Sequence, residues 1–248
     1  MINSDFDIKF YEEAYGLNSN NLLKSYLDFD KIYHPPYEKY QKILIEKISK
    51  NSEVLDLCVG DGIHSILPAK ISKYYTALEP TKSGLNILKQ KFKEEGIINY
   101  TLINSKIENF YSENIFDLIT IINSTSYFEK NELKRIYNTN LKKGGYLILI
   151  DSLRTNPIYR FNHLINALMG KRSFHAINRI FTYSNLKLYL DGFKKSSIET
   201  YYFGPFLFLA TIFKKLGLNS FSFYISNYPK KGSIFDRFSF KFLTIITK

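Results

Sequence analysis

The sequence predicts an α/β fold in which a seven-stranded, mostly parallel sheet carries helices on both faces. From Glu53 onward, short apolar segments alternate with helical segments, which is the pattern of parallel βαβ units. Five apolar segments follow this rhythm, and two more come after a looser helical stretch. An N-terminal helical lid before the sheet and a helical insert before the last strand complete the predicted fold.

The elements follow from composition and spacing. In the first 50 residues, Tyr40, Leu44 and Ile48 share a helical face, after the pair Pro35-Pro36 interrupts an earlier helical stretch around residues 22–27. We expect strands at residues 53–58, 74–79, 99–103, 116–122, 146–151, 198–203 and 239–248. Helices are expected at residues 82–95, 133–141, 159–169, 184–192 and 205–216, with Gly144 and Gly145 between helix and strand.

Composition narrows the class of protein. The chain has 248 residues, of which 45% are apolar and 23% charged, close to average globular usage. The first 13 residues lack the basic and apolar regions of a secretory signal, and the longest apolar stretch, residues 205–213, is too short to span a bilayer. We therefore expect a cytoplasmic protein. One cysteine and no His/Cys ligand pattern predict no metal site.

The net charge of +11 is unevenly distributed. Residues 1–150 hold 19 Lys plus Arg against 19 Asp plus Glu, whereas residues 151–248 hold 15 against 4. A basic face suits an anionic partner such as a phosphorylated substrate, a nucleotide or a lipid surface. A lysine-biased genome that decorates solvated helices explains the excess equally well.

The first predicted strand runs into a glycine-bearing turn at residues 54–62. Gly60 and Gly62 let the backbone approach a ligand closely, and free amides at the following helix start favour a negatively charged atom. Glu79 lies at the tip of the second strand, 17 residues after Gly62. A carboxylate there can accept hydrogen bonds from ribose hydroxyls.

With these residues the chain resembles the class I S-adenosylmethionine-dependent methyltransferases, which have a Rossmann-like sheet. Residues 54–62 match the family's first motif, except that Cys58 replaces its first glycine. Residues 116–119 match the fourth strand, and residues 144–147 match the turn into the fifth. The resemblance covers residues 40–151 and, by strand count, extends to the end. It implies S-adenosylmethionine as the cofactor.

The resemblance also implies which residues meet the cofactor. Glu79 would hold the ribose, residues 105–108 would line the adenine, and Asn123 would lie beside the methionine moiety. The implied cofactor residues are Asp56, Cys58, Gly60, Gly62, Glu79, Ser105, Ile107, Glu108 and Asn123. Residues 1–50 would form the lid, and residues 51–248 the methyltransferase domain, with helical elements on the acceptor side within 152–238.

A nicotinamide-dependent dehydrogenase is the nearest competitor that uses such a sheet. Its phosphate-binding turn requires glycine or alanine at a third position, where this chain has Ser65. The methyltransferase interpretation is therefore preferred.

A hydroxyl acceptor benefits from a general base, which is usually histidine. Of the four histidines, His34 and His175 lie in irregular segments and are the candidate catalytic residues. His64 follows the glycine turn and suits a cofactor-pocket or packing role, and His163 suits a structural role within a helix. Tyr11 and Tyr15 would lie in the lid.

The function predicted from the sequence is methylation of oxygen or carbon on a small-molecule acceptor, such as a glycan, a lipid-linked compound or another secondary metabolite. The acceptor is expected to be anionic or lipid-linked, with peripheral membrane contact allowed and no stable nucleic-acid partner. The Asn/Asp-Pro-Pro-Tyr type of motif found in amino-methylating relatives is replaced by Asn123-Ser124-Thr125-Ser126. Two alternatives stay open: an RNA methyltransferase that uses the basic C-terminal region, and a cofactor-binding protein without transferase activity.

Overall fold

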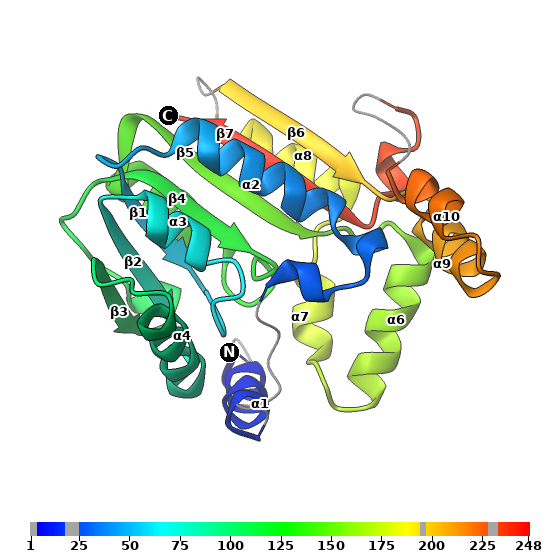
Figure 1. Cartoon of the computed structure of the whole chain (residues 1–248), viewed down its shortest axis with the longest axis horizontal. Helices are drawn as coiled ribbons and strands as arrows, with labels where there is room; N and C mark the ends of the chain where they lie inside the picture. Colours follow the sequence, from blue (N-terminus) through cyan, green and yellow to red (C-terminus); the bar gives the residue numbers. More distant parts are fainter. Residues whose placement is uncertain (1–3, 18–24, 194–196, 228–232) are drawn as a thin grey trace.

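A computed structural model describes residues 4–17, 25–193, 197–227 and 233–248 and contains one seven-stranded sheet (Figure 1). The strand order is β3-β2-β1-β4-β5-β7-β6, in which β7 runs antiparallel to both of its neighbours and all other pairs are parallel. The strands are β1 (Glu53–Leu57), β2 (Tyr74–Glu79), β3 (Tyr100–Asn104), β4 (Phe116–Ile122), β5 (Leu141–Ser152), β6 (Ser197–Phe203) and β7 (Lys241–Thr247). The predicted sheet of seven mostly parallel strands is confirmed.

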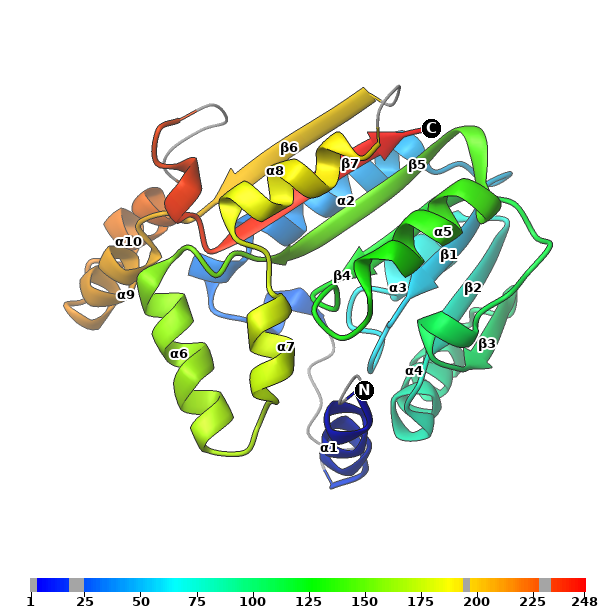
Figure 2. The same cartoon turned by 180° about the vertical axis from the view of Figure 1, so that it is seen from behind.

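Helices cover both faces of the sheet. Figure 1 shows α2 and α3 in front of it, and Figure 2 shows α5 and α8 on the opposite face. The helices are α1 (Ser4–Leu17), α2 (Pro35–Lys47), α3 (Ile66–Ile71), α4 (Lys82–Glu94), α5 (Lys130–Asn140), α6 (Pro157–Leu168), α7 (Phe174–Arg179), α8 (Tyr183–Asp191), α9 (Leu207–Lys215) and α10 (Asn219–Ser226). One apolar core joins the sheet to α5 and α8, and a second joins it to α2 and α4.

The central strands are apolar because both of their faces are covered. Val54, Leu55 and Leu57 of β1 are fully buried, as expected for an interior parallel strand. The order of strands reverses between β1 and β4, so the connections leave these two strands in opposite directions. Such a switch point opens a crevice at the carboxyl ends of the strands, where ligands bind in open α/β sheets.

Several predicted boundaries differ from the structure. Pro35 and Pro36 begin α2 instead of interrupting a helix, because a proline in the first turn loses no helical hydrogen bond. The glycines at 144–145 lie inside β5, whose register with β4 shifts there. A Cβ on Gly145 would lie 2.8 Å from the carbonyl oxygen of Asp117, which explains the glycine. Of the predicted helical stretch around residues 22–27, residues 22–24 lie outside the described residues, and Tyr26–Asp28 form a short 3-10 helix.

The two N-terminal helices differ in their packing. Tyr40, Ile43 and Leu44 of α2 are buried in the same core as the sheet. By contrast, α1 lies below the carboxyl ends of the strands, beside α4 (Figure 1). None of the helices in the described ranges combines the length and the apolarity needed to cross a bilayer.

Candidate active site

The turn after β1 has an unusual backbone. Cys58, Gly60 and Gly62 all have positive φ, at 55°, 56° and 73°. The amide of Cys58 donates to the carbonyl of Leu78 in β2 at 2.7 Å, which ties the turn to the neighbouring strand. The left-handed conformation is costly for a residue with a Cβ, so glycine is favoured at such positions.

Glu79 ends β2 as a buried carboxylate beside this turn. Its Oε2 accepts the amide of Gly60 at 2.9 Å, and its Oε1 accepts the amide and the hydroxyl of Thr81 at 3.0 and 2.6 Å. Burial raises the pKa of this carboxyl, although its hydrogen bonds act in the opposite direction. The three donors fix the carboxylate at the rim of a cavity.

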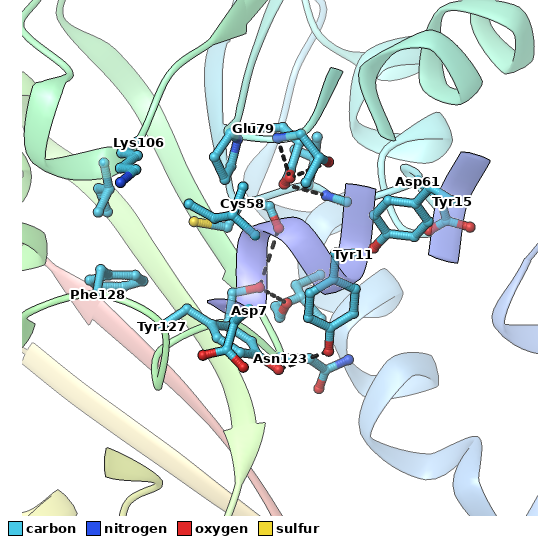
Figure 3. Close-up of a pocket in the computed structure, with 18 of the residues that line it drawn as sticks. Asp7, Tyr11, Tyr15, Cys58, Asp61, Glu79, Lys106, Asn123, Tyr127 and Phe128 are labelled. Carbon is cyan, nitrogen blue, oxygen red and sulfur yellow. Dashed lines mark hydrogen bonds between the residues drawn. The ribbon is translucent and has the colours of Figure 1, made fainter. Parts of the chain in front are cut away.

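That cavity has a volume of about 210 Å³ and lies at the carboxyl ends of β1, β2 and β4. Figure 3 shows Glu79 towards one end, with Asn123 and Tyr127 towards the other. Its walls come from the glycine turn, the tips of β2 and β4, the segment after β3, and α1. The lining residues are Asp7, Ile8, Tyr11, Tyr15, Cys58, Val59, Gly60, Asp61, Ile63, His64, Glu79, Pro80, Thr81, Lys106, Ile107, Glu108, Ile122, Asn123, Ser124, Tyr127 and Phe128.

Helix α1 covers the cavity with aromatic side chains. The hydroxyls of Tyr11 and Tyr127 are 2.8 Å apart, and their rings meet edge to face. The hydroxyl of Tyr15 lies 2.6 Å from the point where a Cβ on Gly60 would stand. The glycine therefore serves the approach of the covering helix as well as the turn.

Two carboxylates of α1 fasten it on either side of the cavity. Glu12 accepts the backbone amides of Lys82 and Ser83, at 2.8 and 3.0 Å, in the first turn of α4. Asp7 accepts the amide and the hydroxyl of Ser173, at 3.0 and 2.6 Å, at the start of α7. Free amides at a helix start are suited to an anion, so each contact stabilises the position of α1.

Six of the nine cofactor residues implied by the resemblance line this cavity: Cys58, Gly60, Glu79, Ile107, Glu108 and Asn123. Asp56 does not. It is buried within β1 and accepts hydroxyl hydrogen bonds from Tyr75, Thr120 and Ser65 at 2.5, 2.8 and 3.1 Å. A ligand cannot reach a carboxylate whose lone pairs serve three buried hydroxyls, so the geometry gives Asp56 a structural role.

Gly62 and Ser105 are also outside the lining. A Cβ on Gly62 would lie 2.3 Å from Cδ1 of Leu88, so this glycine lets α4 pack against the turn. The hydroxyl of Ser105 donates to the carbonyl of its neighbour Lys106 at 3.2 Å. Gly62 therefore allows close packing of α4, and Ser105 makes a contact with the adjacent backbone.

The structure does not bring the two candidate bases, His34 and His175, to the cavity. His34 is buried directly before α2, with its Nε2 2.8 Å from the carbonyl oxygen of Phe29. His175 is exposed on α7, and its Nε2 lies 3.2 Å from a guanidinium nitrogen of Arg179. Irregular sequence around a histidine does not show where its side chain will point, and these two side chains point to the backbone of Phe29 and to Arg179.

His64 is the histidine that lines the cavity. Its ring stacks on Tyr37 with centroids 4.6 Å apart, and its Nε2 is buried without a partner among the described residues. Burial, with help from Lys241 and Lys91, lowers the pKa of this imidazole to about 3. His64 is therefore neutral at physiological pH.

Asn123 directly follows β4 at the far end of the cavity, with a positive φ of 60°. Its side-chain amide donates to the hydroxyl of Tyr37 at 3.1 Å and accepts from Nζ of Lys241 at 2.5 Å. Sequence reasoning did not identify Tyr37 or Lys241, because nothing local marks a residue that reaches the site from α2 or from the last strand. In the part of the chain that the structure describes, no cluster of three or more His, Cys, Asp or Glu residues could hold a metal ion.

Comparisons with known proteins agree with this geometry. Residues 54–145 match the family model described as methyltransferase domain. The fold is similar to that of the N-methyltransferase NodS from Bradyrhizobium japonicum WM9 in complex with S-adenosyl-L-homocysteine, with a TM-score of 0.59, 14% identity, and 96% and 98% of the two chains covered.

Two further structures extend the comparison. The YcgJ protein from Bacillus subtilis has a TM-score of 0.58 at 14% identity and covers 86% of this chain and 98% of its own. The plantazolicin methyltransferase BpumL, in complex with S-adenosyl-L-homocysteine, has a TM-score of 0.53 at 14% identity, with 100% and 88% covered. None of the curated proteins matches the sequence.

Proposed function

We propose that this chain, which carries an S-adenosylmethionine-dependent methyltransferase domain of the class I fold, methylates a small-molecule acceptor on oxygen or carbon. The observation that carries the proposal is the cavity beneath α1, with Glu79 towards one end and Asn123 towards the other. Because α1 covers the cavity, an acceptor that reaches Asn123 must fit between helices. This favours a small molecule over a folded macromolecule.

The residues of the cavity fit the cofactor. A carboxylate offers about four lone-pair positions, and Glu79 uses three of them for Gly60 and Thr81. The remaining position supports hydrogen bonding to a ribose hydroxyl. Ile107 supplies an apolar wall suited to the adenine.

When bound, S-adenosylmethionine supplies a methyl group on a positively charged sulfur. The chain's residues then have to hold the acceptor in line, with the reacting atoms about 3 to 3.5 Å apart. Asn123 is suited to this positioning because Tyr37 and Lys241 fix the orientation of its amide. Helix α1 shields the cavity from water.

The sequence supports oxygen or carbon as the methylated atom, because Asn123-Ser124-Thr125-Ser126 lacks the motif of amino-methylating relatives. The fold itself does not select the atom, since it is shared with an N-methyltransferase. The acceptors we propose are a glycan, a lipid-linked compound or another secondary metabolite. The similar fold of the plantazolicin methyltransferase supports the last of these.

Exposed apolar side chains near the acceptor end support a lipid-linked acceptor. Three helices, α6, α9 and α10, carry them at the same end of the molecule in both views (Figures 1 and 2). The exposed apolar residues on or directly after these helices are Phe161, Leu164, Ile165, Leu168, Met169, Phe208, Ile212, Leu216, Leu218, Phe221, Phe223 and Tyr224. Exposed Lys171 and Lys215 lie beside them, as expected for peripheral contact with an anionic membrane.

Calorimetry with S-adenosyl-L-homocysteine tests the cofactor site. Glu79→Gln should weaken binding roughly ten- to a hundredfold, because a charged hydrogen-bond acceptor beside the ligand is lost. Glu94→Gln, on the exposed side of α4, is the matched control and should bind like the wild type. Unchanged affinity of Glu79→Gln would show that the ribose assignment is wrong, and no binding by the wild type would contradict the proposed function.

The acceptor is tested with methyl-labelled S-adenosylmethionine and a metabolite extract of the native cells. Label should enter a small molecule, which mass spectrometry identifies. Label that enters purified total RNA, with retention on RNA that falls with salt, would favour the RNA alternative. Binding of the cofactor with no transfer to either preparation would favour a cofactor-binding protein.

A further inference from the structure

Two cations, the buried Lys241 and the partly buried Arg172, lie next to the acceptor end of the cavity. The first is Lys241, which begins β7 and is 6% exposed. Its ammonium donates to the amide oxygen of Asn123 and lies 5.7 Å from the ring centroid of Tyr37. Burial lowers the pKa of Lys241, but Tyr37 and Asp151 help to raise it above its usual value, so the side chain stays charged at neutral pH.

The second cation is Arg172, between α6 and α7. One terminal nitrogen of its guanidinium donates to the hydroxyl of Ser126 at 2.6 Å, and the other lies 3.3 Å from Nδ1 of His163. The guanidinium also lies over the ring of Tyr127, 5.0 Å from its centroid. Its Nε is buried and has no hydrogen-bond partner within the described ranges.

His163 adds a third donor to this cluster. Burial, together with Arg172, lowers the pKa of its imidazole to about 4, so the ring is neutral at physiological pH. Because Nδ1 faces a guanidinium, which can only donate, Nδ1 has to accept and the proton belongs on Nε2. This Nε2 is buried and lacks an acceptor among residues placed by the structure.

The positive charge has no carboxylate partner. Among the described residues, no Asp or Glu oxygen lies within 4.0 Å of the side-chain nitrogens of Lys241 or Arg172. The two nearby acids are engaged elsewhere, Asp151 with Thr125 and the amide of Ser152, and Asp7 with Ser173.

The remaining segments of the chain add no further carboxylate, because residues 1–3, 18–24, 194–196 and 228–232 contain no Asp or Glu. The charge of Asp151 helps to raise the pKa of both Lys241 and Arg172, but its oxygens already accept hydrogen bonds from Thr125 and Ser152. A buried donor without an acceptor costs free energy. Nε of Arg172 and Nε2 of His163 therefore favour an anion that supplies acceptor oxygens.

Position connects this cluster with the reaction. Lys241 bonds to Asn123, and Arg172 stacks on Tyr127, and both of these partners line the cavity at the end away from Glu79. Arg172 contacts His163, and the charges of Lys241 and Asp151 also act on the pKa of this imidazole. An anion bound there would lie beside the acceptor end.

We propose that the methyl acceptor carries an oxyanion, a carboxylate or a phosphate, which Arg172 and His163 bind while Lys241 adds positive potential. This inference rests on the proposed function, because it names the substrate class of the same site. Arg172 offers its free Nε and His163 its free Nε2 to the oxygens of the anion. The anion supplies the hydrogen-bond acceptors that these two atoms lack and fixes the methyl acceptor relative to Asn123.

The probes are inorganic phosphate and acetate, each titrated at constant ionic strength, with chloride as the balancing anion, into protein saturated with S-adenosyl-L-homocysteine. Calorimetry should show saturable binding of at least one of them, and the tighter probe identifies the kind of oxyanion. Arg172→Gln should weaken it about tenfold or more, since a charge-assisted hydrogen bond is lost. Arg160→Gln, the same change at an exposed position of α6, should have no effect.

A second variant guards against misfolding of the first. Arg172→Lys keeps the charge but not the fork of donors, so it should bind more weakly than the wild type and more tightly than Arg172→Gln. The inference is overturned if the wild type binds S-adenosyl-L-homocysteine but neither anion saturably. Equal anion affinity in the wild type, Arg172→Lys and Arg172→Gln also overturns it. A wild type that does not bind S-adenosyl-L-homocysteine would instead contradict the proposed function.

Discussion

Cys58 and Asn123 both have a left-handed backbone conformation, which is uncommon for residues other than glycine. In the described part of the chain they are the two non-glycine residues with positive φ, and both line the cavity. A left-handed conformation costs a non-glycine residue about 1 kcal/mol or more. Residues strained in this way concentrate at functional sites, and these two directly follow the strands that flank the switch point.

Replacements at Cys58 test this strain. Cys58→Gly should leave the free energy of unfolding unchanged or raise it by up to about 1 kcal/mol, because glycine adopts φ of 55° without strain. Cys58→Val should lower it by more than about 1 kcal/mol, since a β-branched residue suits positive φ least. Urea denaturation measures both variants, and equal destabilisation by glycine and valine would contradict the strain.

His64 predicts a dependence of stability on pH. The pKa of His64 is near 6.5 in the unfolded chain and about 3 in the folded one. Its contribution to the free energy of unfolding is therefore complete above pH 6.5 and is lost as the pH falls towards 3. Between pH 7 and 5 the loss amounts to about 2 kcal/mol.

His64→Phe keeps the ring that stacks on Tyr37 and removes the titrating group, so the stability loss between pH 7 and 5 should become smaller. His175→Phe, which replaces an exposed imidazole, is the control and should follow the wild-type profile. Denaturation at a series of pH values measures all three proteins. A His64→Phe profile parallel to that of the wild type would refute the assignment.

At the scale of elements, the contacts of Glu12 decide where α1 lies. This carboxylate accepts two amides of α4, whereas the neighbouring Glu13 is exposed and pairs with Lys9 at 4.0 Å on the same helix. Capping contacts of this kind contribute about 1 kcal/mol. Removing the charge of Glu12 should therefore loosen the whole helix.

Hydrogen exchange of α1 measures this effect. In Glu12→Gln the amides of α1 should exchange several-fold faster than in the wild type, because opening of the helix from α4 becomes easier. Glu13→Gln, a matched change one residue away, should exchange as the wild type does. Equal exchange in both variants would mean that the contact with α4 does not hold α1.

The elements themselves were largely predictable. The observed bounds of β1, β2, β4 and β6 lie within one residue of the sequence prediction, because apolar and β-branched runs bounded by turns identify buried strands. The short helices α7 and α10 were missed, since six and eight residues give too few turns for a helical period to be visible. The segment predicted as a helix at residues 205–216 ends at Lys215, and Gly217, with φ of 79°, follows it.

At the scale of the whole molecule, the exposed apolar residues of α6, α9 and α10 predict membrane contact. The protein should sediment with vesicles of phosphatidylcholine mixed with phosphatidylglycerol, and less with phosphatidylcholine alone, because the basic C-terminal region favours anionic lipid. Leu168→Glu, at a residue 72% exposed on α6, should weaken the binding.

Leu188→Glu provides a matched control, because Leu188 is 71% exposed but lies on α8, away from this end of the molecule. It should bind vesicles as the wild type does. Equal vesicle binding by both variants, or a stable dimer of the wild type that Leu168→Glu dissociates, would contradict membrane contact.

The sequence by itself determined the sheet, the glycine turn and Glu79, because strand periodicity and turn chemistry are local properties of the chain. Tertiary structure alone decided which side chains meet. It buried Asp56 in a hydroxyl network, turned His34 and His175 away from the cavity, and brought Lys241 to Asn123. Such contacts join residues up to 118 positions apart, and their geometry depends on how helices and strands pack, which no local pattern records.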